Sequence, residues 1–321
     1  MRAPAKINLQ LSVGPSRADG YHDLVTVFQA VSLFDEVTVT PADQDAVTVT
    51  GEGAGDVPAD GDNLALRAVA ALRAALPGVG EPVRVAIRKR IPVAAGLAGG
   101  SADAAAALVA CNELWDAGLT HEQLGEIGSD VGSDVAFAVL GGTSVGRGRG
   151  ELLTQALVPN AQYHWVLAFA DGQLSTPAVY AKTDELRGGA ATAPAAELDT
   201  TLMAALRAGD PVRVGKALSN DLQPAALAMF PTLRKTLDAG REFGALGALV
   251  SGSGPTCLFL ARSSERALAL AVSLSGAGVC RSVATAIGPA PGAMLLDRPG
   301  HDRLGLDKPG PDRSGPDRPG R

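Results

Sequence analysis

The chain has 321 residues, which is enough for two domains of ordinary size around a substantial hydrophobic core. Its formal net charge of −6 argues against a nucleic-acid-binding protein, which usually carries a basic surface. The sequence contains no run of about 18 apolar residues and no apolar signal region, so we expect a cytoplasmic protein without a membrane partner. The sequence has three widely spaced cysteines, Cys111, Cys257 and Cys280, which argue against a disulfide framework and against a metal cluster with close ligand spacing.

The first forty residues predict strands. Polar and apolar residues alternate over 4–13, which places Lys6 and Asn8 on the same face of a strand. A surface strand would show the same pattern, so the alternation alone gives Lys6 no function. A turn-rich loop over 14–24 ends in Gly-Tyr-His-Asp, and further strands are expected at 25–31 and 35–40.

The next elements lead into an unusual loop. We expect a strand at 45–50, a helix from 64 to about 76 capped by Asp62 or Asn63, and a strand at 83–90. The segment 91–107 then reads IPVAAGLAGGSADAAAA. Its glycines predict a loop, and its alanines predict a helix that runs to about residue 115 with Ser101 as the N-cap.

A glycine-rich loop between a strand and a helix N-terminus is a typical anion site, because free N–H groups and the helix dipole both favour negative charge there. The segment matches neither the Walker A pattern nor the dinucleotide pattern G-x-G-x-x-G. A chain with 39 glycines could also contain such a loop as a plain structural turn. The loop alone therefore leaves phosphate binding and a structural role equally open.

Two Gly-Ser-Asp triplets follow a short predicted helix at 120–127, which begins with a Thr120/Gln123 capping box. The triplets end in Asp130 and Asp134. Asp134 directly precedes an apolar run, where a partly desolvated carboxylate would need a cation nearby. A helix-capping aspartate would explain the same local sequence.

The second half alternates strands and helices. The expected elements are a strand at 165–170, a helix starting near Pro177, helices at 196–207, 211–218 and 231–239, a strand–turn–strand unit at 247–260, a helix at 264–277 and a strand at 281–287. From residue 297 a five-residue repeat is dominated by Gly, Pro and charge, with almost no apolar surface to bury. We expect a low-complexity disordered tail over 289–321.

Three segments, PAKINLQLSV, IPVAAGLAGGSADAAAAL and LVSGSGPTCLFL, resemble in order and spacing the galactokinase–homoserine kinase–mevalonate kinase–phosphomevalonate kinase (GHMP) superfamily. The first segment and its continuation are similar to the 4-diphosphocytidyl-2-C-methyl-D-erythritol kinases of non-mevalonate isoprenoid biosynthesis. The match covers about residues 1–288. It implies an α+β fold of two domains: a ribosomal protein S5 domain 2-like ATP-binding domain at 1–155 and an α/β sandwich domain at 156–288.

The resemblance also implies a reaction, the transfer of the ATP γ-phosphate to the 2-hydroxyl of a small cytidyl substrate, with Mg²⁺. It assigns Lys6 and Asp134 as catalytic residues and Asn8, Tyr21, His22 and Tyr180 as substrate-binding residues, with the two tyrosines stacking on the base. The implied ATP-binding residues are Asn63, Leu64, Lys89, Pro92, Val93, Ala94, Ala95, Gly96, Leu97, Ala98, Gly99, Gly100, Ser101 and Ala102. A monomer or weak homodimer without a nucleic-acid partner is expected.

Some loop residues depart from the family pattern. Ala98 replaces a common glycine, which is acceptable only where the backbone needs no positive φ. Asp103 replaces a frequent asparagine and adds a negative charge near the phosphates. The sequence assigns no magnesium ligand.

Two rival functions stay open. A kinase for homoserine or mevalonate is disfavoured by the aromatic residues Tyr21, His22 and Tyr180, since those substrates offer no base to stack. A non-catalytic nucleotide sensor is disfavoured by the retention of Lys6 and Asp134 together with Asn8 and the loop.

Overall fold

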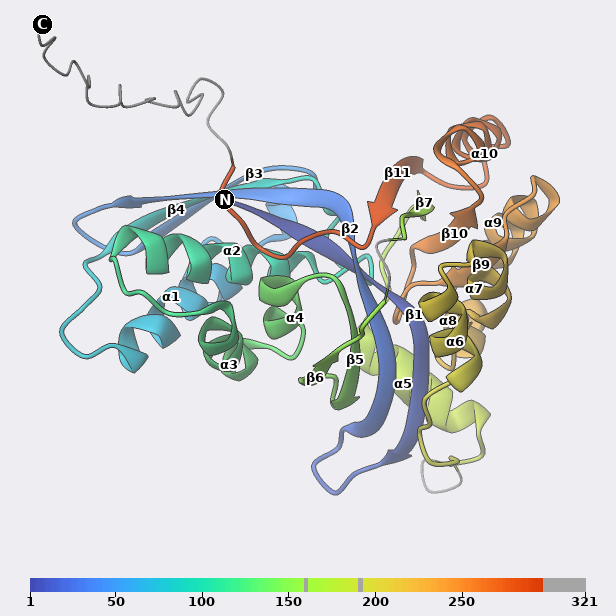
Figure 1. Cartoon of the computed structure of the whole chain (residues 1–321), viewed down its shortest axis with the longest axis horizontal. Coiled ribbons are helices and arrows are strands. Elements are labelled where there is room, and N and C mark those ends of the chain that lie inside the picture. The colour runs from blue at the N-terminus through green and yellow to red at the C-terminus, as the bar shows by residue number, and fades with distance from the viewer. Residues whose placement is uncertain (159–160, 190–192, 297–321) are drawn as a thin grey trace, which may run out of the picture.

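A computed structural model describes residues 1–158, 161–189 and 193–296. The chain forms two sheets with helices packed on them (Figure 1). The larger sheet has seven strands in the order β3-β4-β2-β1-β8, with β5 paired to β2 and β6 paired to β5. Its strands are β1 (Arg2–Ser16), β2 (His22–Pro41), β3 (Ala46–Gly51), β4 (Val83–Lys89), β5 (Thr143–Gly148), β6 (Leu152–Gln155) and β8 (Ser219–Asn220).

The antiparallel pair β1 and β2 forms the centre of this sheet. The strands predicted at 25–31 and 35–40 are one continuous strand of 20 residues, so the predicted break between them is wrong. Register shifts between Pro4 and Ala5 and between Asn8 and Gln10 interrupt the ladder. Such bulges bend a strand and re-aim its side chains, which lets one strand serve both the core and a polar site.

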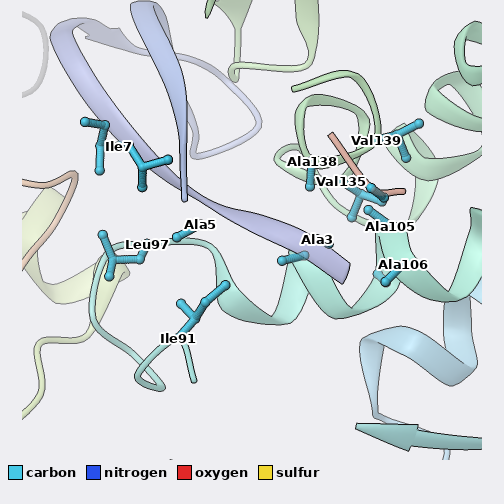
Figure 2. Packing of buried hydrophobic residues seen from close by; sticks show 14 of the residues in the cluster. Ala3, Ala5, Ile7, Ile91, Leu97, Ala105, Ala106, Val135, Ala138 and Val139 are labelled. Carbon is cyan, nitrogen blue, oxygen red and sulfur yellow. The ribbon is translucent and has the colours of Figure 1, made fainter. Parts of the chain in front are cut away.

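Four helices follow the first strands: α1 (Leu64–Ala75), α2 (Gly99–Leu114), α3 (His121–Val131) and α4 (Val135–Leu140), with a short 3₁₀ turn at Ala54–Asp56. Figure 2 shows Ala3, Ala5 and Ile7 of β1 near Ile91, Leu97 and the α2 alanines. Ala104 to Ala107 are all fully buried. Small side chains let backbones approach closely, so the alanine run brings α2 and the loop before it against β1.

The second sheet has the order β11-β7-β10-β9 and belongs to the C-terminal half. Its strands are β7 (Tyr163–Phe169), β9 (Gly247–Val250), β10 (Cys257–Ala261) and β11 (Ser282–Gly288). The helices of this half are α5 (Thr176–Leu186), α6 (Thr200–Ala208), α7 (Pro211–Ala217), α8 (Gln223–Met229), α9 (Thr232–Glu242) and α10 (Ser264–Gly276). The sequence did not predict α8.

The two halves are joined by more than the chain connection. Strand β8, from the C-terminal half, pairs in parallel with β1. The indole nitrogen of Trp165 donates a buried hydrogen bond of 2.9 Å to Gln29 of β2. Within the described ranges, no helix is long and apolar enough to cross a membrane.

Two of the three helix N-caps predicted from local sequence agree with the structure. Asn63 caps α1 by accepting a hydrogen bond from the Ala65 amide, and the Thr120 capping box is present. The prediction for Ser101 is wrong, because α2 begins two residues earlier, with Ala98 in the N-cap position.

The expected tail begins too early at 289. Residues 290–294 return to the N-terminal half, where Ala293 donates a backbone hydrogen bond to Ala138 and Met294 pairs with Arg2. Because its backbone groups are paired with those of the N-terminal half, this stretch belongs to the folded part of the chain. Residues 297–321, which carry the predicted repeat, lie outside the described residues.

Candidate active site

One cavity of about 970 Å³ is enclosed by β1, β2, the loop before α2, helix α5 and the glycine turn after β9. The predicted site residues on its wall are Lys6, Asn8, Tyr21, His22, Asn63, Leu64, Lys89, Pro92, Val93, Ala94, Ala95, Gly96, Ala98, Gly99, Gly100, Asp134 and Tyr180. Leu97, Ser101 and Ala102 do not line it. Leu97 and Ala102 are buried in the core, and the Leu97 carbonyl instead accepts a hydrogen bond from the Lys6 amide at 3.0 Å.

The N-terminal end of α2 has free amides, and two of its residues, Gly99 and Gly100, line this cavity. Within the described structure, the backbone N–H groups of Gly99, Gly100 and Ser101 have no acceptor. Unpaired donors and the helix dipole together favour an anion at such an end. The loop thus has the form that phosphate binding requires.

The loop backbone is tightly constrained. Gly96 has φ +74°, and a Cβ there would clash with the Ser251 carbonyl oxygen of the glycine turn. Ala98 has φ 57°, so the condition under which alanine would be tolerated here without strain is not met. An L-residue in this left-handed region costs roughly 1–2 kcal/mol, and such strain is typical of ligand-binding loops.

Lys89 lies on the cavity wall but is held by a buried ionic network. Its ammonium pairs with Asp35 and, at 2.7 Å, with Asp103. The second oxygen of Asp35 accepts the backbone amides of Arg90 and Ile91 at 2.6 and 2.9 Å. These contacts fix the start of the loop, and no sequence pattern signalled that Asp35 would take part.

Lys6 and Asp134 are brought together from β1 and the start of α4. The Lys6 ammonium lies 3.4 Å from Asp134 Oδ2 and 3.3 Å from Asn8 Oδ1, and it sits 4.8 Å above the Phe28 ring. Asp134 occupies the N-cap position of α4, yet its side chain makes no capping hydrogen bond. The residue lines the cavity instead, so the structure does not show the capping role that the local sequence left open.

Asn8 is fixed by a short chain of hydrogen bonds. Its amide donates to Thr26 Oγ1 at 2.8 Å, and the Thr26 hydroxyl donates to the Gln10 carbonyl at 2.6 Å. This orients Asn8 Oδ1 toward Lys6. Thr26 was not identified from sequence, because one threonine in a strand carries no functional signal.

Also on the cavity wall, His22 stacks on Tyr180, with ring centroids 5.1 Å apart and 28° between the planes. The Nε2 atom of His22 lies 3.0 and 3.2 Å from the two Asp184 carboxylate oxygens. A carboxylate only accepts hydrogen bonds, so Nε2 carries a proton. Burial raises the pKa of Tyr180, so its phenol stays protonated.

Tyr21 is placed differently from Tyr180. It is 55% exposed, and the Arg149 guanidinium lies 5.0 Å from its ring centroid. The Tyr21 and Tyr180 rings make no contact with each other in the described structure. Both line the cavity, so a base sandwich between them remains a prediction. Arg149 and Asp184 were missed, since an arginine in a glycine-rich turn and a helical aspartate look like solvated surface residues.

Other chemistries find little support among the described residues. No group of three or more His, Cys, Asp or Glu side chains lies together as a metal centre. Burial raises the pKa of Cys111 and of Cys257 to about 12, so both thiols stay protonated and are poor nucleophiles.

Comparison with known proteins agrees with this geometry. Residues 63–142 match the GHMP kinases N terminal domain, and residues 202–280 match the GHMP kinases C terminal domain. A 4-diphosphocytidyl-2-C-methyl-D-erythritol kinase from Nocardia farcinica is 54% identical over 92% of this chain and 96% of its own length. One from Thermobifida fusca is 53% identical over 92% of this chain and 97% of its own.

A solved structure shows the same architecture. The crystal structure of a 4-(cytidine 5'-diphospho)-2C-methyl-D-erythritol kinase superposes with a TM-score of 0.72 at 31% identity, over 90% of this chain and all of that one. The two-domain α+β fold expected from the sequence is thereby confirmed. The chain belongs to the GHMP kinase superfamily and, within it, to the family of 4-diphosphocytidyl-2-C-methyl-D-erythritol kinases.

Proposed function

We propose that this chain transfers the γ-phosphate of ATP to the 2-hydroxyl of 4-diphosphocytidyl-2-C-methyl-D-erythritol. The observation that carries the proposal is the Lys6–Asp134 pair, which lines the same cavity as the free amides of α2. A phosphate donor and an acceptor hydroxyl can therefore meet in one enclosed space. Phosphoryl transfer depends mainly on positioning and charge stabilisation, and this cavity offers both.

On the donor side, the loop 92–100 would hold the triphosphate by its backbone. The amides of Gly99 and Gly100 supply donors, and the left-handed turns at Gly96 and Ala98 let the main chain curve around the phosphates. Asn63 and Leu64, at the start of α1, line the cavity beside this loop and are the proposed adenine contacts.

On the acceptor side, Asp134 would accept a hydrogen bond from the substrate 2-hydroxyl and take its proton as the new phosphate bond forms. Such general base action is worth typically about 10²–10⁴ in rate. The Lys6 ammonium, 3.4 Å from the carboxylate, would stabilise negative charge on the transferring phosphoryl group. Asn8 holds the ammonium in place from its other side.

Magnesium fits this site as a companion of ATP. Mg²⁺ in kinase sites is held by substrate phosphates and one or two protein carboxylates, and it neutralises phosphate charge. The Asp134 side chain is 30% exposed, and one of its oxygens has no partner among the described residues, so Asp134 would supply a protein oxygen to the ion. A dedicated acidic cluster is not needed for that role.

The substrate side favours a cytidyl group. His22, Tyr180 and Tyr21 line the part of the cavity that lies toward α5, and aromatic rings are suited to stacking on a planar base. Homoserine and mevalonate offer no such base. A cytoplasmic location and a monomeric or weakly dimeric state complete the proposal.

A coupled ADP-release assay tests it, with the diphosphocytidyl substrate, homoserine and mevalonate compared side by side. We expect turnover with the first compound alone. Turnover with homoserine or mevalonate but not with the cytidyl compound would overturn the substrate assignment. Nucleotide binding without turnover of any of the three would favour a non-catalytic sensor.

A further inference from the structure

Residues 290–294, the C-terminal strap, run from the second sheet back across the N-terminal half (Figure 1). The strap follows β11 and ends beside β1, where Met294 forms a β-bridge with Arg2. Ala290 and Ala293 are buried. The described residues that line the cavity include none from the strap, so any effect of the strap on the reaction must pass through other residues.

The strap takes the place of a further turn at the end of α4. In a longer helix the Gly142 amide would donate to the Ala138 carbonyl. Here the Gly142 amide donates to the Ala290 carbonyl at 2.8 Å. The Ala138 carbonyl accepts a hydrogen bond from the Ala293 amide at 2.9 Å. The strap thus pairs two backbone groups that the end of a helix leaves without an intrahelical partner.

Helix α4 has six residues, and a helix this short depends on its neighbours for stability. Helices α2 and α3 and strand β1 all contact it. The strap adds a close backbone contact. A Cβ atom on Gly292 would overlap the Val139 carbonyl oxygen, and one on Gly141 would overlap the Gly292 amide. Backbone lies directly on backbone here, so α4 cannot tilt without moving the strap.

The strap also packs beneath the Lys6 ammonium. Ala290 lies in a small buried cluster with Phe137 of α4 and Phe28 of β2. The centroids of the two rings are 5.1 Å apart, and the Lys6 ammonium lies 4.8 Å from the centre of the Phe28 ring. Asp134 directly precedes α4. One cluster therefore supports both members of the Lys6–Asp134 pair.

We propose that the C-terminal strap is a positioning element of the reaction, which holds α4 so that Asp134 stays within reach of Lys6 and of the acceptor hydroxyl. This role rests on the proposed function, because it takes Asp134 as the general base. Any tilt of α4 changes the 3.4 Å separation between the Asp134 carboxylate and the Lys6 ammonium. Misplacement of a reacting group by about 1 Å can cost about a hundredfold in rate. Ala290 and Gly292 are thus positioning residues that contact neither substrate.

Gly292→Ala in the full chain tests this role, because the added methyl group must push the strap away from α4. With ATP and the cytidyl substrate we expect kcat to fall at least about tenfold. Both Michaelis constants should change by less than about twofold, since the cavity wall is untouched. Hydrogen exchange at the amides of α4 should become faster than in the wild type. Thermal unfolding shows whether the variant is folded.

Ala290→Gly is the milder variant, and it keeps the test decisive if Gly292→Ala does not fold. It removes one methyl group from the cluster with Phe28 and Phe137 and leaves the backbone hydrogen bonds of the strap in place. We expect kcat to fall by about threefold, with both Michaelis constants unchanged.

Gly215→Ala is the matched control. Gly215 lies in α7, and an added methyl group there would overlap the Leu246 carbonyl oxygen. The variant therefore has a comparable backbone clash in the C-terminal half, and neither residue is among the described residues on the cavity wall. We expect it to lose stability but to keep the wild-type kcat per folded molecule and the wild-type exchange of α4.

A double variant separates positioning from a general loss of stability. If the strap acts through Asp134, Gly292→Ala should lower the residual rate of Asp134→Asn by less than about twofold, because the carboxylate to be positioned is already gone. Independent effects would multiply instead. A further loss as large as that in the wild-type background would overturn the positioning role.

The remaining outcomes separate this role from the proposed function. Wild-type kcat in a folded Gly292→Ala, or unchanged exchange of α4, would overturn the positioning role and leave the proposed function intact. A raised Michaelis constant with unchanged kcat would place the strap in substrate binding and would also overturn it. If the wild type did not turn over the cytidyl substrate, the proposed function would fail, and the positioning role with it.

Discussion

The hydroxyl of Ser251 donates a hydrogen bond of 3.0 Å to the carbonyl oxygen of Gly96, a residue 155 positions earlier in the chain. The contact joins the glycine turn of the C-terminal half to the loop 92–100, which lines the cavity. On the same turn, the hydroxyl of Ser253 lies 2.8 Å from that of Thr176 on α5. The loop 92–100 is therefore held in place by the half of the molecule that supplies Tyr180 and Asp184.

Replacing Gly96 should disturb this contact. The Gly96→Ala variant combines an unfavourable φ of +74° with a clash against the Ser251 carbonyl, so the loop must shift. We expect affinity for an ATP analogue to fall at least about tenfold, and stability to fall by more than the 1–2 kcal/mol of strain alone. Calorimetry and denaturant unfolding measure the two effects.

Gly278→Ala is the control for that variant, because Gly278 has a similar φ of +63° with open space around it. It carries the strain without the clash and should leave nucleotide affinity unchanged. If Gly96→Ala lost no more affinity and stability than Gly278→Ala, the close contact between Gly96 and Ser251 would contribute nothing to binding or stability.

Ala98→Gly should make the protein more stable. Alanine at φ 57° is strained by roughly 1–2 kcal/mol, while glycine adds unfolded-state entropy worth about 0.5–1 kcal/mol. The net expectation is a gain of up to about 1.5 kcal/mol in the free energy of unfolding. Ala70→Gly, exposed in the middle of α1, should instead lose about 1 kcal/mol. A loss in both variants would show that the loop is not strained at Ala98.

Sequence patterns identified the elements that depend on neighbours along the chain. The Thr120 capping box and the alternation around Lys6 both report local geometry, and both led to the observed elements. The Ser101 prediction failed because α2 begins at Gly99, where the backbone lies so close to Ile91 that a side chain would crowd it. Local propensity cannot weigh that contact.

The charged partners of the site residues were harder to predict from the sequence than the helices and strands. Asp35 lies 54 positions from Lys89, and Asp184 lies 162 positions from His22. Such pairs depend on how sheets and helices pack. The residues next to an aspartate in a strand or helix do not indicate which distant side chain it will contact. Lys6 and Asp134 were assigned through family motifs. Their local sequences alone fitted a surface strand for Lys6 and a helix cap for Asp134.

Asp184→Asn should weaken binding of the cytidyl substrate. The carboxylate holds the protonated Nε2 of His22 at 3.0 Å, and an amide replaces this charge-assisted bond by a weaker one. A loss of about 1.5 kcal/mol corresponds to roughly a tenfold rise in the Michaelis constant for that substrate. The Michaelis constant for ATP should not change, which steady-state kinetics with each substrate varied in turn will show.

Glu185→Gln provides the comparison for Asp184. Glu185 is the next residue on α5, and its exposed carboxylate pairs with Lys182 instead of a cavity residue. This variant should behave as wild type for both substrates. If Asp184→Asn raised only the Michaelis constant for ATP, His22 and Asp184 would belong to the ATP site, and their assignment to the cytidyl substrate would be wrong.

Asp134→Asn tests the catalytic assignment itself. An amide has the shape of the carboxylate but cannot take a proton from the acceptor hydroxyl, and it leaves Lys6 without its anionic partner at 3.4 Å. We expect the maximal rate to fall at least about a hundredfold, in line with the loss of a general base. Affinity for an ATP analogue, measured by calorimetry without Mg²⁺, should change little because the loop amides remain. Asp130→Asn, in the preceding Gly-Ser-Asp triplet, lies exposed at the end of α3 and should retain most of the rate. Equal losses from the two variants would mean that the Lys6–Asp134 pair is not the centre of the reaction, since only one of these carboxylates lies against Lys6.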